Sequence, residues 1–287
     1  MRLGGKARGY HMANITSFWY VLFYPSIRRR CRYYLSRRFP TRVRLWQRFL
    51  DSYRLVCAYA KTLVDIAVLR LFGPSALPAI CPDHDRLIQL ASDPRGFVLL
   101  QAHVGCWQVG ISTLTQFPKP VSIVLIPEAR TPALFGPLVV NAIDPRSGLD
   151  SIIQMTDALL RGEIVTMMGD RTFGSDQTSV TVQFLGSPAP FPIIPYRLAS
   201  ATGCPVLVML APRLPPNRYE MRLVDIIEVP PNLGRNPQDY APYAQQFANR
   251  LEQFAQEFPW QIFNFYDLWQ DTPPSSPLAL YSGRGSG

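Results

Sequence analysis

Beyond the segment GPSALP, the chain alternates short apolar runs with segments of helical periodicity, and this alternation limits the possible folds more than any other feature. The apolar runs include GFVLLQA, PVSIVLIPE, EIVTMMGD and PVLVMLAPR. Among the segments with helical spacing, YAPYAQQFANRLEQFAQEF has the clearest apolar face. Strands that alternate with helices form largely parallel sheets covered by helices. The sequence therefore predicts an α/β domain with a mostly parallel central sheet flanked by helices.

The first fifth of the chain has a different composition from the rest. Residues 1–61 contain 14 lysines and arginines and one acid, a net charge of +13, whereas the remainder contains 15 bases and 19 acids. Residues 10–72 have the spacing of helices. We expect a basic, aromatic helical segment at residues 1–72, the α/β domain at 73–270, and a disordered tail rich in Pro, Ser and Gly at 271–287.

The basic segment has the composition of a membrane-contacting module. FWYVLFYPSIRRRCRYYLSRRF interleaves aromatic rings with arginines, which suits the headgroup region of an anionic bilayer. Its longest apolar run, residues 18–25, is shorter than the roughly 20 residues that span a membrane. We expect a peripheral protein that lies on the cytoplasmic face of a membrane. A helical hairpin with solvated arginines is the alternative, and no nucleic-acid-binding pattern accompanies residues 26–48.

The cysteines and prolines predict further local features. The five cysteines are scattered without a CxxC pair, which is typical of a reducing compartment and argues against a disulfide framework or a zinc site. CPDHD holds the densest group of possible metal ligands, but Asp83 precedes the apolar positions of a helix and fits an N-cap better. The prolines of SPAPFPIIP indicate a loop.

The stretch LLQAHVGCWQVG holds the candidate catalytic base. His103 directly follows the apolar run FVLLQA, and ligands of parallel sheets bind beyond the carboxyl ends of the strands. If a helix begins at His103, its N-terminus favours the neutral imidazole that a general base needs. Gly105 would leave room for a substrate, and Gln108 lies within reach of the ring. A histidine packed at a strand end is the structural alternative.

Four segments together resemble a known family. HVGCWQ is similar to the H-x4-D/E motif of the lysophospholipid acyltransferase superfamily, and in particular to the H-x-G-N-W-E of the bacterial lipid A biosynthesis acyltransferases. LLRGEIVTMMGDRTFG, VTVQFLGSPAPFPIIPYRLASATGCPVLV and LEQFAQEFPWQIFNFYDLW resemble later parts of the same family. The resemblance covers roughly residues 15–270 in order. FNFYDLW is most similar to the branch associated with aryl polyene pathways.

The resemblance implies a glycerolipid acyltransferase-like fold and a definite reaction. A fatty acyl group would pass from acyl carrier protein or coenzyme A to a hydroxyl of a membrane lipid or glycolipid. His103 would take the hydroxyl proton, and neither a covalent intermediate nor a metal or other cofactor is required. The resemblance also implies a peripheral or monotopic protein on the cytoplasmic face of a bacterial inner membrane. Anionic inner-membrane lipid is the expected surface, and no nucleic acid partner is implied.

Gln108 departs from the family pattern, because it stands where the motif has a carboxylate. Replacing the acid of a comparable catalytic triad by an amide costs about 10⁴-fold in rate. Three interpretations follow. Another acid could serve His103, with Asp170 as the first candidate and Glu128 as the second; the enzyme could be slow; or the chain could be an impaired member that binds lipid or acyl carrier without turnover.

The resemblance also suggests substrate-binding residues. Arg171 would meet a phosphate or pantetheine, although a surface turn formed with Asp170 is the alternative. Phe184 and Gly186 match the family's FFG element and would shape the pocket, or else pack in the core. Arg130 and Arg197 are candidate anion-binding residues. Cys106 is not expected to be a nucleophile, because the motif usually has asparagine there.

Overall fold

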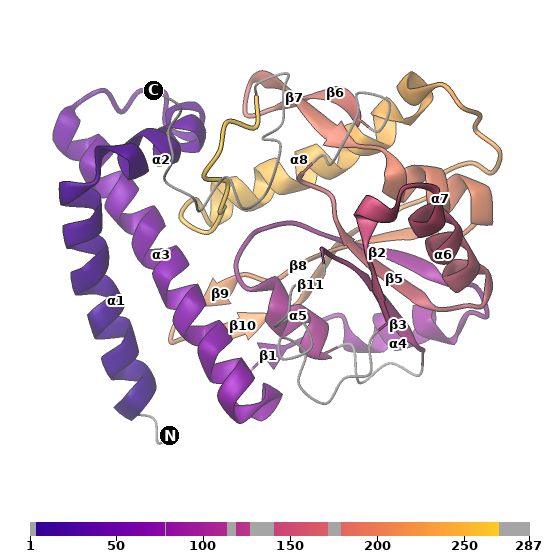
Figure 1. Ribbon diagram of the computed structural model, residues 1–287, viewed down its shortest axis with the longest axis horizontal. Coiled ribbons are helices and arrows are strands. Elements are labelled where there is room, and N and C mark those ends of the chain that lie inside the picture. The colour runs from indigo at the N-terminus through magenta and orange to yellow at the C-terminus, as the bar shows by residue number, and fades with distance from the viewer. Residues whose placement is uncertain (1–3, 78, 114–118, 127–140, 172–178, 270–287) are drawn as a thin grey trace.

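The computed structural model describes residues 4–77, 79–113, 119–126, 141–171 and 179–269 (Figure 1). Three helices lie together on one side of the molecule, and a sheet covered by further helices makes up the other side. In residue ranges, the three helices are α1 (Gly4–Phe23), α2 (Pro25–Arg38) and α3 (Leu45–Phe72). The predicted helical character of residues 10–72 is thus confirmed, apart from short connections between these helices.

The central sheet has six strands in the order β11-β8-β2-β5-β3-β4. All neighbouring strands are parallel except β11 and β8, which are antiparallel. The strands are β2 (Phe97–Gln101), β3 (Val121–Val124), β4 (Asn141–Ile143), β5 (Ile164–Met168), β8 (Val206–Leu210) and β11 (Arg222–Ile227). The prediction of a mostly parallel central sheet is confirmed.

Alternate residues of the inner strands supply two cores, one on each face of the sheet. Val98 and Leu100 belong to the larger core, which α8 enters with Phe247. Leu99 faces the opposite way, into a smaller core with Leu87 of α4. This period of two is what a strand buried on both faces requires. The covering helices are α4 (His84–Ser92), α5 (Trp107–Thr113), α6 (Leu149–Leu160), α7 (Ile194–Thr202) and α8 (Ala241–Glu257).

Two small sheets complete the fold. One contains β1 (Ala79–Ile80), β9 (Arg213–Leu214) and β10 (Arg218–Glu220), and the other is a hairpin of β6 (Ser179–Phe184) and β7 (Ser187–Pro192). The loop predicted for SPAPFPIIP is therefore wrong over residues 187–192. The prolines are tolerated because β7, within the described residues, pairs with β6 alone, and the buried Ala189 and Phe191 between them fill the core.

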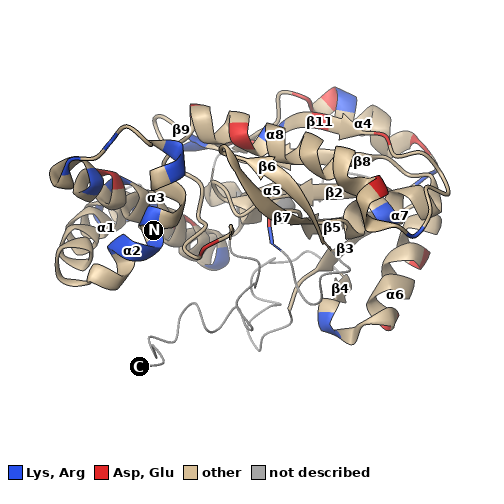
Figure 2. Cartoon of the chain, turned by 90° about the horizontal axis from the view of Figure 1, so that it is seen from above, with Lys and Arg blue, Asp and Glu red and all other residues tan. Residues whose placement is uncertain are grey.

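The three N-terminal helices carry much of the basic charge, and α2 contacts the end of α8 and the residues that follow it (Figure 2). The Tyr34 hydroxyl donates a hydrogen bond to the carbonyl of Pro259 at 2.9 Å, and Arg38 Nε donates to the carbonyl of Ala255 at 2.8 Å. These contacts tie α2 to the α/β part of the chain. Among the described residues, no helix combines the length and the apolar character needed to cross a membrane.

Of two predicted helix starts, the one at Asp83 is confirmed in position and the one at His103 is wrong. Asp83 occupies the N-cap position of α4, but its carboxylate accepts a hydrogen bond from the Leu223 amide at 3.1 Å instead of capping the helix. α5 begins at Trp107, four residues after His103, because the intervening residues form an extended loop. In that loop Val104 pairs with Ile262 as an isolated β-bridge.

Gly105 is the tightest point of this loop. Its amide donates to the carbonyl of Gln261 at 3.0 Å, and its φ is +54°. A β-carbon at this position would lie 1.9 Å from the carbonyl oxygen of Ala211. Glycine is thus required by backbone packing, and not, as expected from the sequence, by the space that a substrate needs.

Replacing Gly105 by alanine should destabilise the fold strongly. The new β-carbon would collide with backbone, so we expect the free energy of unfolding to fall by about 3 kcal/mol or more. Gly203→Ala is the matched control, because Gly203 also has a positive φ, but a β-carbon added there would meet no atom within 4 Å. That variant should lose about 1 kcal/mol, the cost of the left-handed backbone alone. Urea denaturation of both proteins measures the difference, and equal losses would contradict the proposed collision.

Candidate functional site

The parallel register of two neighbouring strands brings His103 and Asp170 together. Gln101 of β2 lies opposite Met168 of β5. His103 and Asp170 each follow this pair by two residues. His103 Nδ1 lies 2.9 Å from Asp170 Oδ1, and the His103 amide donates to Asp170 Oδ2 at 3.1 Å. Both carboxylate oxygens therefore contact His103, one at its ring and one at its backbone. Asp170 thus lies where the first of the three interpretations expected an acid.

Burial and neighbouring charges set the protonation of this pair. Burial lowers the pKa of His103, and the Arg171 guanidinium lowers it further, while Asp170 acts in the opposite direction. Burial would raise the pKa of Asp170, but His103 and Arg171 together hold it below its ordinary value. At neutral pH the pair is thus a carboxylate beside a neutral imidazole.

The contact with Asp170 also selects the tautomer of His103. A carboxylate next to Nδ1 accepts a hydrogen bond from the Nδ1–H group, so the proton resides on Nδ1 and Nε2 carries the free lone pair. Asp170 is 1% exposed, whereas the His103 side chain keeps 23% of its surface exposed. The arrangement presents a neutral, oriented base to the surface with its acid buried behind it.

The C-terminal segment after α8 closes over the pair. The Phe263 amide donates to the His103 carbonyl at 3.0 Å, and the Tyr266 hydroxyl donates to the Asp170 carbonyl at 3.3 Å. Arg171 Nη2 lies 3.4 Å from the Phe263 carbonyl, and its guanidinium stands 5.4 Å from the centre of the Tyr266 ring. Arg171 is therefore not part of a solvated surface turn. Sequence reasoning did not assign Phe263 and Tyr266 to the site, although the segment QIFNFYDLW was one of those that carried the family resemblance.

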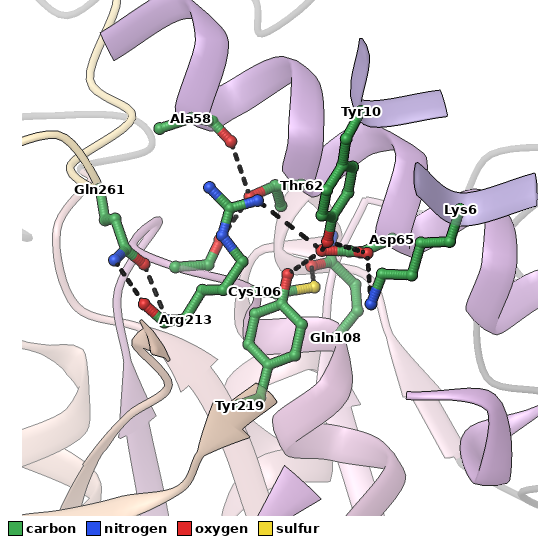
Figure 3. Close-up of polar contacts among 11 residues, drawn as sticks. Lys6, Tyr10, Ala58, Thr62, Asp65, Cys106, Gln108, Arg213, Tyr219 and Gln261 are labelled. Atoms are coloured by element: carbon green, nitrogen blue, oxygen red, sulfur yellow. Dashed lines mark hydrogen bonds and ion pairs between the residues drawn. The ribbon is translucent and has the colours of Figure 1, made fainter. Parts of the chain in front are cut away.

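Gln108 faces away from this pair. Its Oε1 lies 3.6 Å from Cys106 Sγ, and within the described part of the chain it makes no hydrogen bond with His103. The contact expected between Gln108 and His103 is therefore absent here. The reason is the late start of α5, which turns Gln108 toward a second polar cluster (Figure 3).

That second cluster surrounds Asp65, a fully buried acid of α3. Its carboxylate lies 3.1 Å from Lys6 Nζ and accepts hydrogen bonds from the hydroxyls of Tyr10 and Tyr219 (Figure 3). Arg213 Nη1 lies 3.9 Å away. The cluster therefore joins α1, α3 and β10 through one buried charge.

The remaining predicted site residues lie elsewhere in the described structure. Phe184 is fully buried and stacks on Trp269 at 5.8 Å, which is the core-packing alternative. Gly186 forms the β6–β7 turn with a φ of +73°. Arg197 of α7 donates to the carbonyl of Arg235 at 2.9 Å. Arg130 and Glu128 lie outside the described residues. The structure thus brings together His103, Asp170 and Arg171.

Comparison with known proteins assigns the chain to a family. The crystal structure of the 1-acyl-sn-glycerophosphate (LPA) acyltransferase PlsC from Thermotoga maritima matches with 13% identity and a TM-score of 0.43, covering 86% of this chain and 98% of that one. A search of curated proteins gave no significant match. The model of the bacterial lipid A biosynthesis acyltransferase family matches residues 58–271, a range that includes both His103 and Asp170. The chain therefore belongs to the bacterial lipid A biosynthesis acyltransferases, a family of enzymes that transfer acyl groups to lipid substrates.

Proposed function

We propose that this acyltransferase moves a fatty acyl group from an acyl carrier protein or coenzyme A thioester to a hydroxyl of a membrane lipid or glycolipid, with His103 as the general base. The observation that carries the proposal is the 2.9 Å contact between His103 Nδ1 and Asp170 Oδ1 at the carboxyl edge of the sheet. It leaves Nε2 as the proton acceptor, which is the state that hydroxyl activation requires. No metal or other cofactor takes part in this scheme.

The reaction divides into two proton transfers around one acyl transfer. His103 Nε2 takes the proton of the acceptor hydroxyl as that oxygen attacks the thioester carbonyl. Asp170 stabilises the resulting imidazolium across the Nδ1 contact. When the tetrahedral intermediate collapses, the carbon–sulfur bond breaks and the imidazolium returns the proton to the departing thiolate. The products are an ester and a free thiol.

The position of Asp170 favours an active enzyme over an impaired one. A family member that only binds lipid or acyl carrier would have Gln108 against His103 and no acid nearby. Instead the Asp170 carboxylate forms hydrogen bonds with both the ring and the backbone amide of His103. Asp170 is thus proposed to replace the carboxylate that the family motif has at position 108.

The N-terminal helices are proposed to hold the enzyme on the cytoplasmic face of the inner membrane, against anionic lipid. Large apolar side chains are exposed on α1 and at the start of α3, where Phe23 is 66% and Leu45 is 82% exposed. Arginines of α2 lie between them in sequence. Exposed rings and alkyl groups beside arginines fit the headgroup region of a bilayer. Membership of the branch associated with aryl polyene pathways remains a prediction from FNFYDLW.

Asp170→Asn should remove most of the activity. The amide supplies no charge to the imidazolium and can hold the wrong tautomer, so we expect kcat/KM to fall by about 10² to 10⁴-fold. The assay follows thiol release from an acyl thioester, with mass spectrometry of lipid extracts to identify the acylated product. His103→Ala should abolish the added acyl mass.

Gln108→Ala is the matched control for this assay, because Gln108 lies close to His103 in sequence, in the first turn of α5, but faces Cys106. It should keep kcat/KM close to that of the unmodified enzyme. If Gln108→Ala were the inactive protein and Asp170→Asn lost less than about tenfold, the acid assignment would be wrong.

The pH profile should show a base with a lowered pKa. Because the pKa of His103 lies below the ordinary value of about 6.5, kcat/KM should be level from that pH upward through neutrality and fall at lower pH, as the imidazole becomes protonated. Asp170 raises the pKa of His103, so the residual activity of Asp170→Asn should begin to fall at a still lower pH. An acidic limb above pH 6.5 in the unmodified enzyme would contradict this protonation scheme.

A further inference from the structure

A cavity of about 720 Å³ lies among the three N-terminal helices. Its walls include Arg28, Arg29 and Arg32 of α2, Arg42 of the connection between α2 and α3, and Arg48 of α3. Among the described residues, Asp51 is the one acid that lines it. Leu35, Phe39 and Phe49 add apolar surface. The volume lies within the range of small-ligand sites, and the excess of arginines selects for an anion.

Hydrogen bonds and ion pairs within the protein leave some of these arginine side chains available to a ligand. Arg42 pairs with Asp51, and Arg28 donates to the last carbonyls of α1 at Val21 and Leu22. Arg29 and Arg32 make no hydrogen bond or ion pair with any residue that the structure describes. They stand three positions apart on α2 and so share one face of that helix. Two arginines on one face offer the forked donors that bind phosphate oxygens.

The rim of the cavity points to a lipid as the source of the phosphate. Leu22, Leu45 and Trp46 line the cavity and are 41%, 82% and 57% exposed. Trp19 and Phe23 stack at 5.6 Å on the neighbouring part of α1 and are also exposed. A soluble phosphate compound has no apolar part that would bury this rim, whereas the acyl chains of a lipid would cover it.

We propose that this cavity binds the phosphate of an anionic membrane lipid, with the chains of the lipid lying along the exposed apolar rim. The proposal rests on the membrane contact in the proposed function and makes it specific: one lipid headgroup enters a defined site between α1, α2 and α3. A lipid with a choline headgroup is disfavoured, because its ammonium would face the arginines.

The first test measures binding of a soluble short-chain lipid to the full-length protein by calorimetry. Dihexanoylphosphatidylglycerol below its micelle concentration should bind with a stoichiometry of one, and dihexanoylphosphatidylcholine and glycerol 3-phosphate should bind at least about tenfold more weakly. Equal binding of glycerol 3-phosphate would overturn the lipid assignment in favour of a soluble phosphate. Equal binding of the choline lipid would overturn the anion preference.

The second test separates a defined cavity from a generally basic surface. Ser36 lines the cavity on α2 and is exposed, so Ser36→Trp fills the space without changing the charge. We expect it to weaken binding of the short-chain phosphatidylglycerol at least about tenfold, as should the double variant Arg29→Gln/Arg32→Gln. A surface that attracts lipid by charge and apolar contact alone would bind as well, or better, with the added tryptophan.

The matched control is Arg8→Gln/Arg70→Gln, which removes the same charge from exposed positions of α1 and α3 that do not line the cavity. It should leave the short-chain lipid affinity within about twofold of the unmodified protein. Wild-type affinity in both cavity variants would overturn the proposal.

Flotation with phosphatidylcholine vesicles containing phosphatidylglycerol then distinguishes failure of the cavity proposal from failure of the proposed membrane contact. Vesicle binding that persists in those variants leaves the membrane contact standing, and a wild-type protein that does not float contradicts both proposals.

Discussion

The site depends on the parallel, in-register pairing of β2 with β5. In a parallel pair, residues at equal distances past the last paired position emerge side by side, and here those residues are His103 and Asp170. They are 67 positions apart in the sequence. An antiparallel pair would send the two ends to opposite edges of the sheet. A single inserted residue after either strand would turn one side chain to the other face. The position of the acid is thus a consequence of strand order and register.

A buried charge connects this edge of the sheet to the N-terminal helices. Asp65 is surrounded by Lys6, Tyr10, Tyr219 and Arg213, and a carboxylate without such partners would be too costly to bury. One turn earlier on α3, Thr62 Oγ1 lies 3.4 Å from the carbonyl of Gly105. The loop that follows His103 is therefore held between α3 and the C-terminal segment. If the helices lie on a membrane, this packing fixes the distance between the bilayer and the base.

The sequence was most informative where periodicity and position along a strand decide the structure. The alternation of apolar runs and helical segments predicted the parallel sheet, and the position of His103 just past FVLLQA placed it at the carboxyl edge. Asp170 could be proposed as the acid that serves His103 because it also follows a strand. That the two strands are neighbours depends on how the crossover connections pack, which no local sequence pattern encodes. Periodicity also misled: Val104 and Trp107 continue an apolar spacing, yet Val104 pairs with Ile262 and the helix begins only at Trp107. The contacts of Phe263 and Tyr266 come from an aperiodic segment, and so had no signal in the residue pattern alone.

The glutamine at position 108 has a physical explanation that is independent of catalysis. Gln108 points into the cluster that contains Asp65, with its Oε1 3.6 Å from Cys106 Sγ (Figure 3). The thiol of Cys106 is fully buried, and burial is the chief reason that its pKa is raised to about 12, so this region is poor in water. A carboxylate there would meet a larger burial penalty than a neutral amide does. Because α5 is oriented this way, an acid at position 108 would point toward Asp65 and away from His103. The carboxylate that contacts His103 comes instead from Asp170, after the neighbouring strand β5.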